Sequence, residues 1–135
     1  MQPLRGATEL VEALPRRGLT VVLASSGPAE HVERYVDLVR ARGVAAAWTT
    51  ADDVETTKPA PDLLEVALRK VGGSEPITIG DSVWDCEASQ RLGAPSIAVR
   101  TGGFCRDDLL AAGAREVYDS LPELTSALIE GRCGV

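Results

Sequence analysis

The sequence has few of the residues that usually build metal centres and disulfide frameworks. It contains one histidine, at position 31, and three cysteines, at positions 86, 105 and 133, without CxxC spacing. An odd number of cysteines in this arrangement argues against a disulfide framework and against a zinc site, so we expect buried or idle thiols. His31 lies among charged residues of a predicted helix, and we interpret it as a solvated position and not as a ligand or base.

Positive charge and long apolar runs are also scarce. The 135 residues include 14 lysines and arginines against 20 acidic residues, which gives a net charge of −6 and a pI near 4.8. A nucleic acid or an anionic membrane would be repelled by this net negative charge, so we discount both partners. No apolar run is long enough to span a membrane, and the start MQPLRGATEL lacks signal-peptide features, so we expect a cytoplasmic protein. The nucleotide-binding patterns GxGxxG and GxxxxGK[ST] do not occur.

Strand-length apolar runs alternate with segments of helical periodicity. We predict strands at Leu19–Ala24, Val44–Trp48, Ile77–Ile79 and Ser96–Val99. We predict helices at Ala7–Leu14, from Pro28 to before Gly43, and at Pro61–Val71, Val83–Leu92, Arg106–Ala112 and Pro122–Ile129. This alternation is typical of a parallel sheet covered on both faces, and it predicts one α/β domain, a Rossmann-like three-layer sandwich, over residues 1–135. We expect the two tryptophans, Trp48 and Trp84, to pack, and Asp52 and Asp53 to form a solvated turn.

Polar side chains stand where these apolar segments end. They occur in LTVVLASSG (Leu19–Gly27), TTKPAPD (Thr56–Asp62) and ITIGDSVWD (Ile77–Asp85). Because side chains beyond the carboxyl ends of parallel strands converge on one crevice, we expect Ser25, Lys58, Asp81 and Asp85 to share a site. A hydroxyl, a lysine and two carboxylates together suit a phosphate ester and a divalent metal ion.

The first two segments also have purely structural interpretations. Ser25 and Ser26 precede a predicted helix, where their hydroxyls either bind a phosphate at the positive end of the helix dipole or cap the helix. Lys58 is followed by Pro59 and Pro61, which restrict the backbone. It is therefore either a fixed positive charge for a phosphate or an ordinary solvated lysine.

The third segment, GDSVWD, is the strongest single signal. It places two carboxylates, Asp81 and Asp85, beside the start of one helix, where their oxygens suit Mg²⁺. The structural alternative is that Asp81 or Ser82 caps the helix and that Asp85 interacts favourably with the helix dipole.

The three segments together resemble the haloacid dehalogenase-like hydrolase superfamily, most closely its phosphoglycolate phosphatase and β-phosphoglucomutase type. The resemblance covers nearly the whole chain and rests on VLASS, KPAPD and GDSVWD. It implies that Ser25 binds the transferring phosphate, that Lys58 steadies the phosphoryl charge, that Asp81 ligates Mg²⁺ directly or through water, and that Asp85 holds Lys58. It also implies Mg²⁺-dependent hydrolysis of a small phosphorylated metabolite through an aspartyl-phosphate. The later segment IAVRTGGF looks like a family loop beside the site.

The first motif of that family, two aspartates separated by one residue, does not occur in this sequence. In the family the first of these aspartates attacks phosphorus and the second acts as general acid and base. The resemblance therefore implies that the chain as numbered is inactive alone and holds Mg²⁺ weakly. We expect either a true start upstream of Met1 or a truncated or degenerate product that lacks the first motif and the substrate-selecting cap domain.

In the family the first-motif strand is central, between the strand that ends at Ser25 and the strand that ends at Gly80. Without it, two groups of strands expose unpaired backbone groups and apolar edges. We expect one of three outcomes: the two inner strands pair, a partner or a second copy supplies a strand, or the isolated chain is poorly stable. A full five-stranded sheet from this chain alone would contradict this expectation.

Two other functional classes stay open. One is a non-catalytic phosphate-binding or regulatory module that keeps Ser25, Lys58 and Asp81 but does no chemistry. The other is a response-regulator receiver domain, whose motif order is acidic pair, phosphorylated aspartate, hydroxyl, lysine. Ser25 and Lys58 precede Asp81 here, which disfavours the receiver domain.

Overall fold

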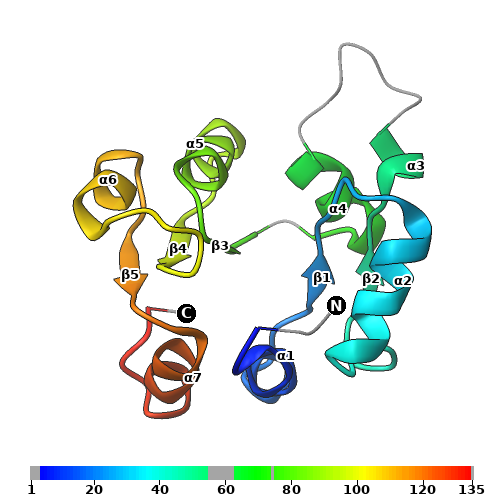
Figure 1. Cartoon of the computed structure of the whole chain (residues 1–135), viewed down its shortest axis with the longest axis horizontal. Coiled ribbons are helices and arrows are strands. Elements are labelled where there is room, and N and C mark those ends of the chain that lie inside the picture. The colour runs from blue at the N-terminus through cyan, green and yellow to red at the C-terminus, as the bar shows by residue number, and fades with distance from the viewer. Residues whose placement is uncertain (1–3, 55–62, 74, 135) are drawn as a thin grey trace. The chain divides into compact units, whose positions relative to one another are not determined.

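Two compact units make up the chain, Met1–Ser74 and Glu75–Val135 (Figure 1). The computed structural model describes residues 4–54, 63–73 and 75–134 of them. The described strands form two parallel sheets, a two-stranded one in the first unit and a three-stranded one in the second. The prediction of an α/β sandwich architecture is confirmed, and that of a single domain stays a prediction.

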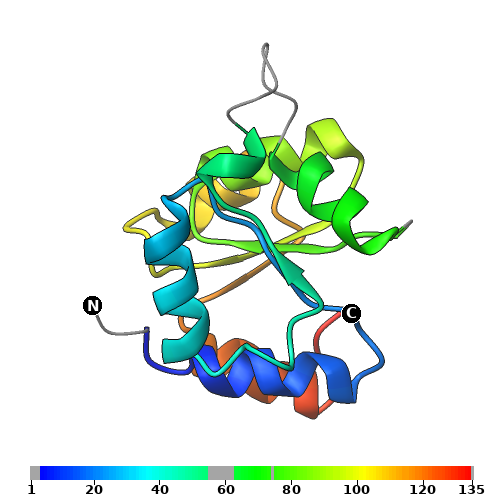
Figure 2. The same ribbon diagram turned by 90° about the vertical axis from the view of Figure 1, so that its right-hand side faces the viewer.

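In its described residues, the first unit contains a short sheet and four helices. Its elements are α1 (Ala7–Arg16), β1 (Val22–Leu23), α2 (Ala29–Leu38), β2 (Ala47–Trp48), α3 (Ala51–Val54) and α4 (Leu63–Val71). The two strands lie side by side in both views, with Val22 opposite Ala47 and Leu23 opposite Trp48 (Figure 2). Helix α4 contacts both strands.

Helix α2 follows from its apolar spacing. Val32, Val36 and Val39 recur at the i, i+4, i+7 positions of one helical face, and all three are buried. Full burial of a valine contributes roughly 1.5–3 kcal/mol, so this stripe fixes the helix in the first unit. Arg40, with a positive φ of 57°, lies just beyond the helix and turns the chain toward β2.

The second unit contains the remaining strands in the order β3-β4-β5. Its elements are β3 (Thr78–Gly80), α5 (Val83–Leu92), β4 (Ser96–Val99), α6 (Arg106–Ala111), β5 (Glu116–Tyr118) and α7 (Leu121–Ile129). The middle strand β4 is buried at all four residues. In both views α5 and α6 lie on one side of this sheet and α7 on the other. The core cluster of the unit consists of Cys86, Ala98, Leu109, Ala114 and Val117.

Several sequence predictions need correction. β1 and β2 are shorter than predicted, β5 was missed, and Asp52 and Asp53 belong to α3 and not to a solvated turn. Trp48 is partly buried, whereas Trp84 packs edge to face on the Phe104 ring and is 67% exposed, so the predicted packing of Trp84 does not place it in the core. Among helices in the described ranges, none has the length and apolar character that crossing a membrane requires.

The inner strands pair only within their own units in the part of the chain that the structure describes. In the described residues, β1 pairs with β2 alone and β3 pairs with β4 alone. Pairing of the two inner strands with each other stays a prediction. A strand supplied by a partner or a second copy, or poor stability of the isolated chain, stays a prediction.

Candidate functional site

Ser25 lies two residues beyond β1, in the turn that leads to α2. Its hydroxyl oxygen accepts a hydrogen bond from the Gly27 N–H at 3.1 Å. The N-cap of α2 is Pro28, and no side chain caps this helix, so the interpretation of Ser25 or Ser26 as a helix cap is wrong. Ser26 is exposed beside it. The Ser25 hydroxyl is thus oriented by the turn, while its proton is available to an acceptor.

Thr49, at the end of β2, holds the backbone of Ser25. Its hydroxyl accepts from the Ser25 N–H at 2.8 Å and donates to the Ser25 carbonyl oxygen at 2.8 Å. The Thr49 side chain is completely buried, and its own N–H donates to Leu23. Sequence reasoning missed this residue. The available signal was a second polar pair, Thr49 and Thr50, directly after a strand, as Ser25 and Ser26 follow β1.

Lys58 lies outside the described residues, so its predicted role stays a prediction. The helices that precede and follow its segment are joined by an ion pair, with Lys70 Nζ 2.9 Å from Asp53 Oδ1. Asp53 also accepts from the Thr50 N–H at 2.8 Å. The hydrogen bonds from Lys70 and from Thr50 hold the pKa of Asp53 below its ordinary value. This pair fixes α3 and α4 to each other in the first unit.

Asp85 forms a capping box at the start of α5. Its Oδ2 accepts from the Asp81 N–H at 2.9 Å and from the Ser82 N–H at 3.1 Å. The Ser82 hydroxyl in turn accepts from the Asp85 N–H at 3.1 Å. The structural interpretation of GDSVWD therefore holds for Ser82 and Asp85, because their side chains satisfy backbone donors that the helix leaves unpaired. The predicted contact between Asp85 and Lys58 lies outside the described residues.

The loop that follows β4 packs against Asp81. Thr101 donates its hydroxyl to Asp81 Oδ2 at 3.4 Å. A Cβ atom on Gly102 would overlap the Asp81 carbonyl oxygen and lie 2.9 Å from the Asp81 Cγ. A Cβ atom on Gly80 would lie 2.5 Å from the Cβ of Asp85. Both glycines are therefore needed for the close approach of the loop, the strand end and the helix start.

The Asp81 carboxylate suits one position in the coordination shell of Mg²⁺. It is partly exposed, and its neighbour Thr101 leaves oxygen lone pairs available. Within the residues that the structure describes, no three histidine, cysteine or acidic side chains gather as a metal cage. Mg²⁺ usually keeps several waters and binds through one or two carboxylates plus substrate phosphate, so this donor set fits a loosely held ion.

The predicted site residues fall into two groups. Ser25 and Ser26 lie in the first unit with Thr49, whereas Asp81 and Asp85 lie in the second unit with Thr101. The convergence of these groups on one crevice stays a prediction.

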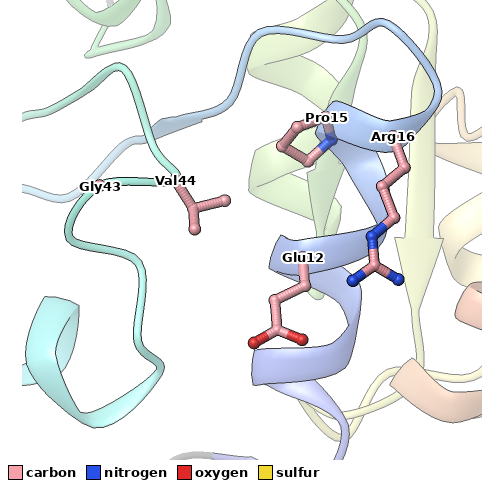
Figure 3. A pocket seen from close by; sticks show the side chains of 5 residues that line it. All are labelled: Glu12, Pro15, Arg16, Gly43 and Val44. Carbon is pink, nitrogen blue, oxygen red and sulfur yellow. The ribbon is translucent and has the colours of Figure 1, made fainter.

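A hollow in the first unit is a different feature. Its lining consists of Glu12, Pro15 and Arg16 on α1 and of Gly43 and Val44 (Figure 3). None of the predicted site residues lines it. It offers one acid and one base beside apolar groups, and none of its lining side chains carries a hydroxyl.

The sequence model that describes haloacid dehalogenase-like hydrolases matches residues 1–93. The chain belongs to the haloacid dehalogenase-like hydrolase family. It is 29% identical over 108 residues to phosphonoacetaldehyde hydrolase of Bordetella pertussis, covering 76% of this chain and 38% of that protein. It is 25% identical over 118 residues to phosphoglycolate phosphatase of Escherichia coli, covering 86% of this chain and 47% of that protein.

Almost the whole of this chain can be superimposed on a solved structure. A crystal structure of a hydrolase from Pseudomonas syringae superimposes with a TM-score of 0.79 and 32% identity, covering 96% of this chain and 63% of that one. The chain thus spans less than half the length of the two curated relatives named above. The resemblance predicted from VLASS, KPAPD and GDSVWD is confirmed at the level of the family.

Proposed function

We propose that this chain is the phosphate-binding and metal-binding part of a hydrolase of small phosphate monoesters. The observation that carries the proposal is that the two carboxylates of GDSVWD make different contacts. Asp85 uses its carboxylate to cap α5, whereas the Asp81 carboxylate faces the Thr101 hydroxyl and keeps oxygens for a metal ion. The family membership and the phosphatase name of one relative support this assignment.

Each predicted residue has a physical role in this proposal. The Ser25 hydroxyl donates to a phosphate oxygen from a position that Thr49 fixes, and Ser26 offers a second hydroxyl. Lys58 balances phosphoryl charge as a point charge. Asp81 would hold Mg²⁺ as one carboxylate ligand, with the remaining ligands supplied by water and substrate oxygens. When bound, Mg²⁺ supplies Lewis-acid polarisation of the phosphoryl group.

We propose further that the 135 residues do not hydrolyse the ester by themselves. Covalent phosphoryl transfer needs a positioned nucleophile, and the sequence holds no pair of aspartates separated by one residue. With p-nitrophenyl phosphate and Mg²⁺ we expect the same rate with the chain, with its Asp81→Asn variant and in buffer. Turnover that Asp81→Asn abolishes would show that the chain is a complete catalyst and would contradict this part of the proposal.

The second candidate is a non-catalytic phosphate-binding or regulatory module, which the missing aspartate pair favours. The intact mass of the native protein separates the two candidates. A mass above 14.2 kDa by roughly 60–100 residues would accommodate a nucleophile and a small cap, and it supports the hydrolase. A mass of 14.2 kDa supports the module. In both cases we propose a cytoplasmic protein without nucleic-acid or membrane partners. For a native chain of 135 residues we propose that the inner strand edges take a strand from a partner or a second copy.

A further inference from the structure

Trp84 is the most exposed large apolar side chain in the described part of the chain, at 67%. An indole ring is large enough that its exposure forgoes much apolar burial, so an exposed tryptophan beside a functional residue calls for an explanation. Trp84 is the second residue of α5, and its ring meets the Phe104 ring edge to face, with centroids 5.4 Å apart and planes at 87°. We call these two rings the aromatic ledge.

Phe104 anchors the ledge to the second unit. Its side chain is partly buried and packs against the core cluster that contains Cys86 and Leu109. Trp84 is therefore held by a fixed ring on one side while most of its surface is open. A rigid aromatic surface of this kind loses little conformational entropy when a ligand covers it.

The ledge is connected to Asp81 through one short loop. Thr101 donates to the Asp81 carboxylate, and Gly102 packs on the Asp81 backbone. Phe104 follows two residues later and meets Trp84, which itself lies three residues after Asp81. The loop thus contacts the candidate metal ligand at one end and the ledge at the other.

We propose that the aromatic ledge binds the organic group of the phosphate ester, so that the preferred substrates carry a planar or apolar group close to the phosphate. This inference rests on the proposed function of the same site. Two rings provide a surface of small-molecule size, whereas a stable protein interface needs about 800 Å² on each partner. The chain just beyond Phe104 is polar and exposed, with Asp107 and Asp108 at the start of α6.

Fluorescence of a single tryptophan tests the ledge directly. The sequence has two tryptophans, so a Trp48→Phe background leaves Trp84 as the only indole reporter. We expect phenyl phosphate, in the presence of Mg²⁺, to change the Trp84 emission and to bind about threefold to tenfold tighter than glycerol phosphate. Calorimetry with Trp84→Ala should show equal affinity for the two esters. The matched control Ile129→Ala, which alters another strongly exposed apolar residue of the second unit, should keep the preference.

Four results would overturn the inference, and they separate its failure from that of the proposed function. Equal affinity of the unsubstituted chain for both esters would show that the ledge does not bind the organic group. The proposed binding of phosphate would not be affected by this result. Phenol binding as tightly as phenyl phosphate separates the ledge from the phosphate site. If Trp84→Ala changes the sedimentation coefficient of the chain, the ledge forms a contact between two copies of the chain and does not bind the ester. Binding of neither ester nor inorganic phosphate overturns the ledge and the proposed function together.

Discussion

The buried hydroxyl of Thr49 bonds to both backbone groups of Ser25, accepting from its N–H and donating to its carbonyl oxygen, each at 2.8 Å. The two residues follow adjacent parallel strands and lie 24 positions apart in the sequence. The candidate phosphate-binding hydroxyl is therefore placed by a residue that makes no predicted contact with phosphate. Its position depends on the pairing of β1 with β2.

Replacement of Thr49 by valine should destabilise the first unit and weaken phosphate binding. Valine keeps the shape of threonine but leaves both backbone groups of Ser25 without their partner, which costs about 1–3 kcal/mol for buried polar groups. Urea denaturation measures the loss of stability. Thr49→Ser keeps the hydroxyl and should recover most of it. Equal stability of the valine and serine variants would contradict the role of the hydroxyl.

Replacement of Gly102 by alanine should displace the loop from Asp81. The new Cβ would overlap the Asp81 carbonyl oxygen, which is backbone and cannot rotate away. We expect weaker Mg²⁺ binding, measured from the Mg²⁺-induced shifts of the Asp81 and Thr101 amide signals in NMR. Cys105→Ala, an exposed change in the same region, serves as the control. An unchanged Mg²⁺ affinity of Gly102→Ala would show that Asp81 does not hold the ion through this geometry.

Two substitutions at Asp85 separate capping from charge. Asp85→Ala removes the acceptor for the Asp81 and Ser82 N–H groups and should cost about 1 kcal/mol of stability. Asp85→Asn keeps one acceptor oxygen and should cost much less in thermal or urea unfolding. Similar losses for both variants would mean that the negative charge, and not the capping geometry, is the stabilising feature. A loss of phosphate affinity on Asp85→Asn would support its predicted interaction with Lys58.

The ion pair between Asp53 and Lys70 predicts an acid-sensitive component of stability. The hydrogen bonds from Lys70 and Thr50 lower the pKa of Asp53 from its ordinary value of 3.8. Its contribution is therefore fully present above that value and is lost as the pH falls through the lower pKa of the folded state. Lys70→Met should reduce this loss in unfolding curves recorded below about pH 4. The neighbouring change Arg69→Met should leave the curve unaltered, and an equal effect of both would point to net charge instead.

Regular periodicity allowed the sequence to predict the long helices and the central strand well. α5 and β4 have the predicted bounds, because Ser82 and Gly93 delimit the helix and because β4 is a short buried apolar run that follows Pro95. α3 and β5 have four and three residues, too few for a helical or alternating pattern to develop. Both elements owe their conformation to tertiary packing.

The sequence predicted which residue types make up the candidate site. It did not predict the contacts that hold these residues in place. The chemistry of Asp81 and Ser25 follows from their positions at strand ends, which motif and spacing reveal. Thr49 and Gly102 act through residues distant in sequence, and such contacts arise only when the strands pair and the loops pack. The exposure of Trp84 likewise depends on how α5 meets the loop after β4.

Isothermal titration of the chain with inorganic phosphate in the presence of Mg²⁺ tests the central claim most directly. We predict saturable binding that both Ser25→Ala and Asp81→Asn weaken, while Ser126→Ala, an exposed serine on α7, leaves it unchanged. Absence of saturable binding, or binding that neither site variant alters, would contradict the claim that these residues handle phosphate and its metal ion.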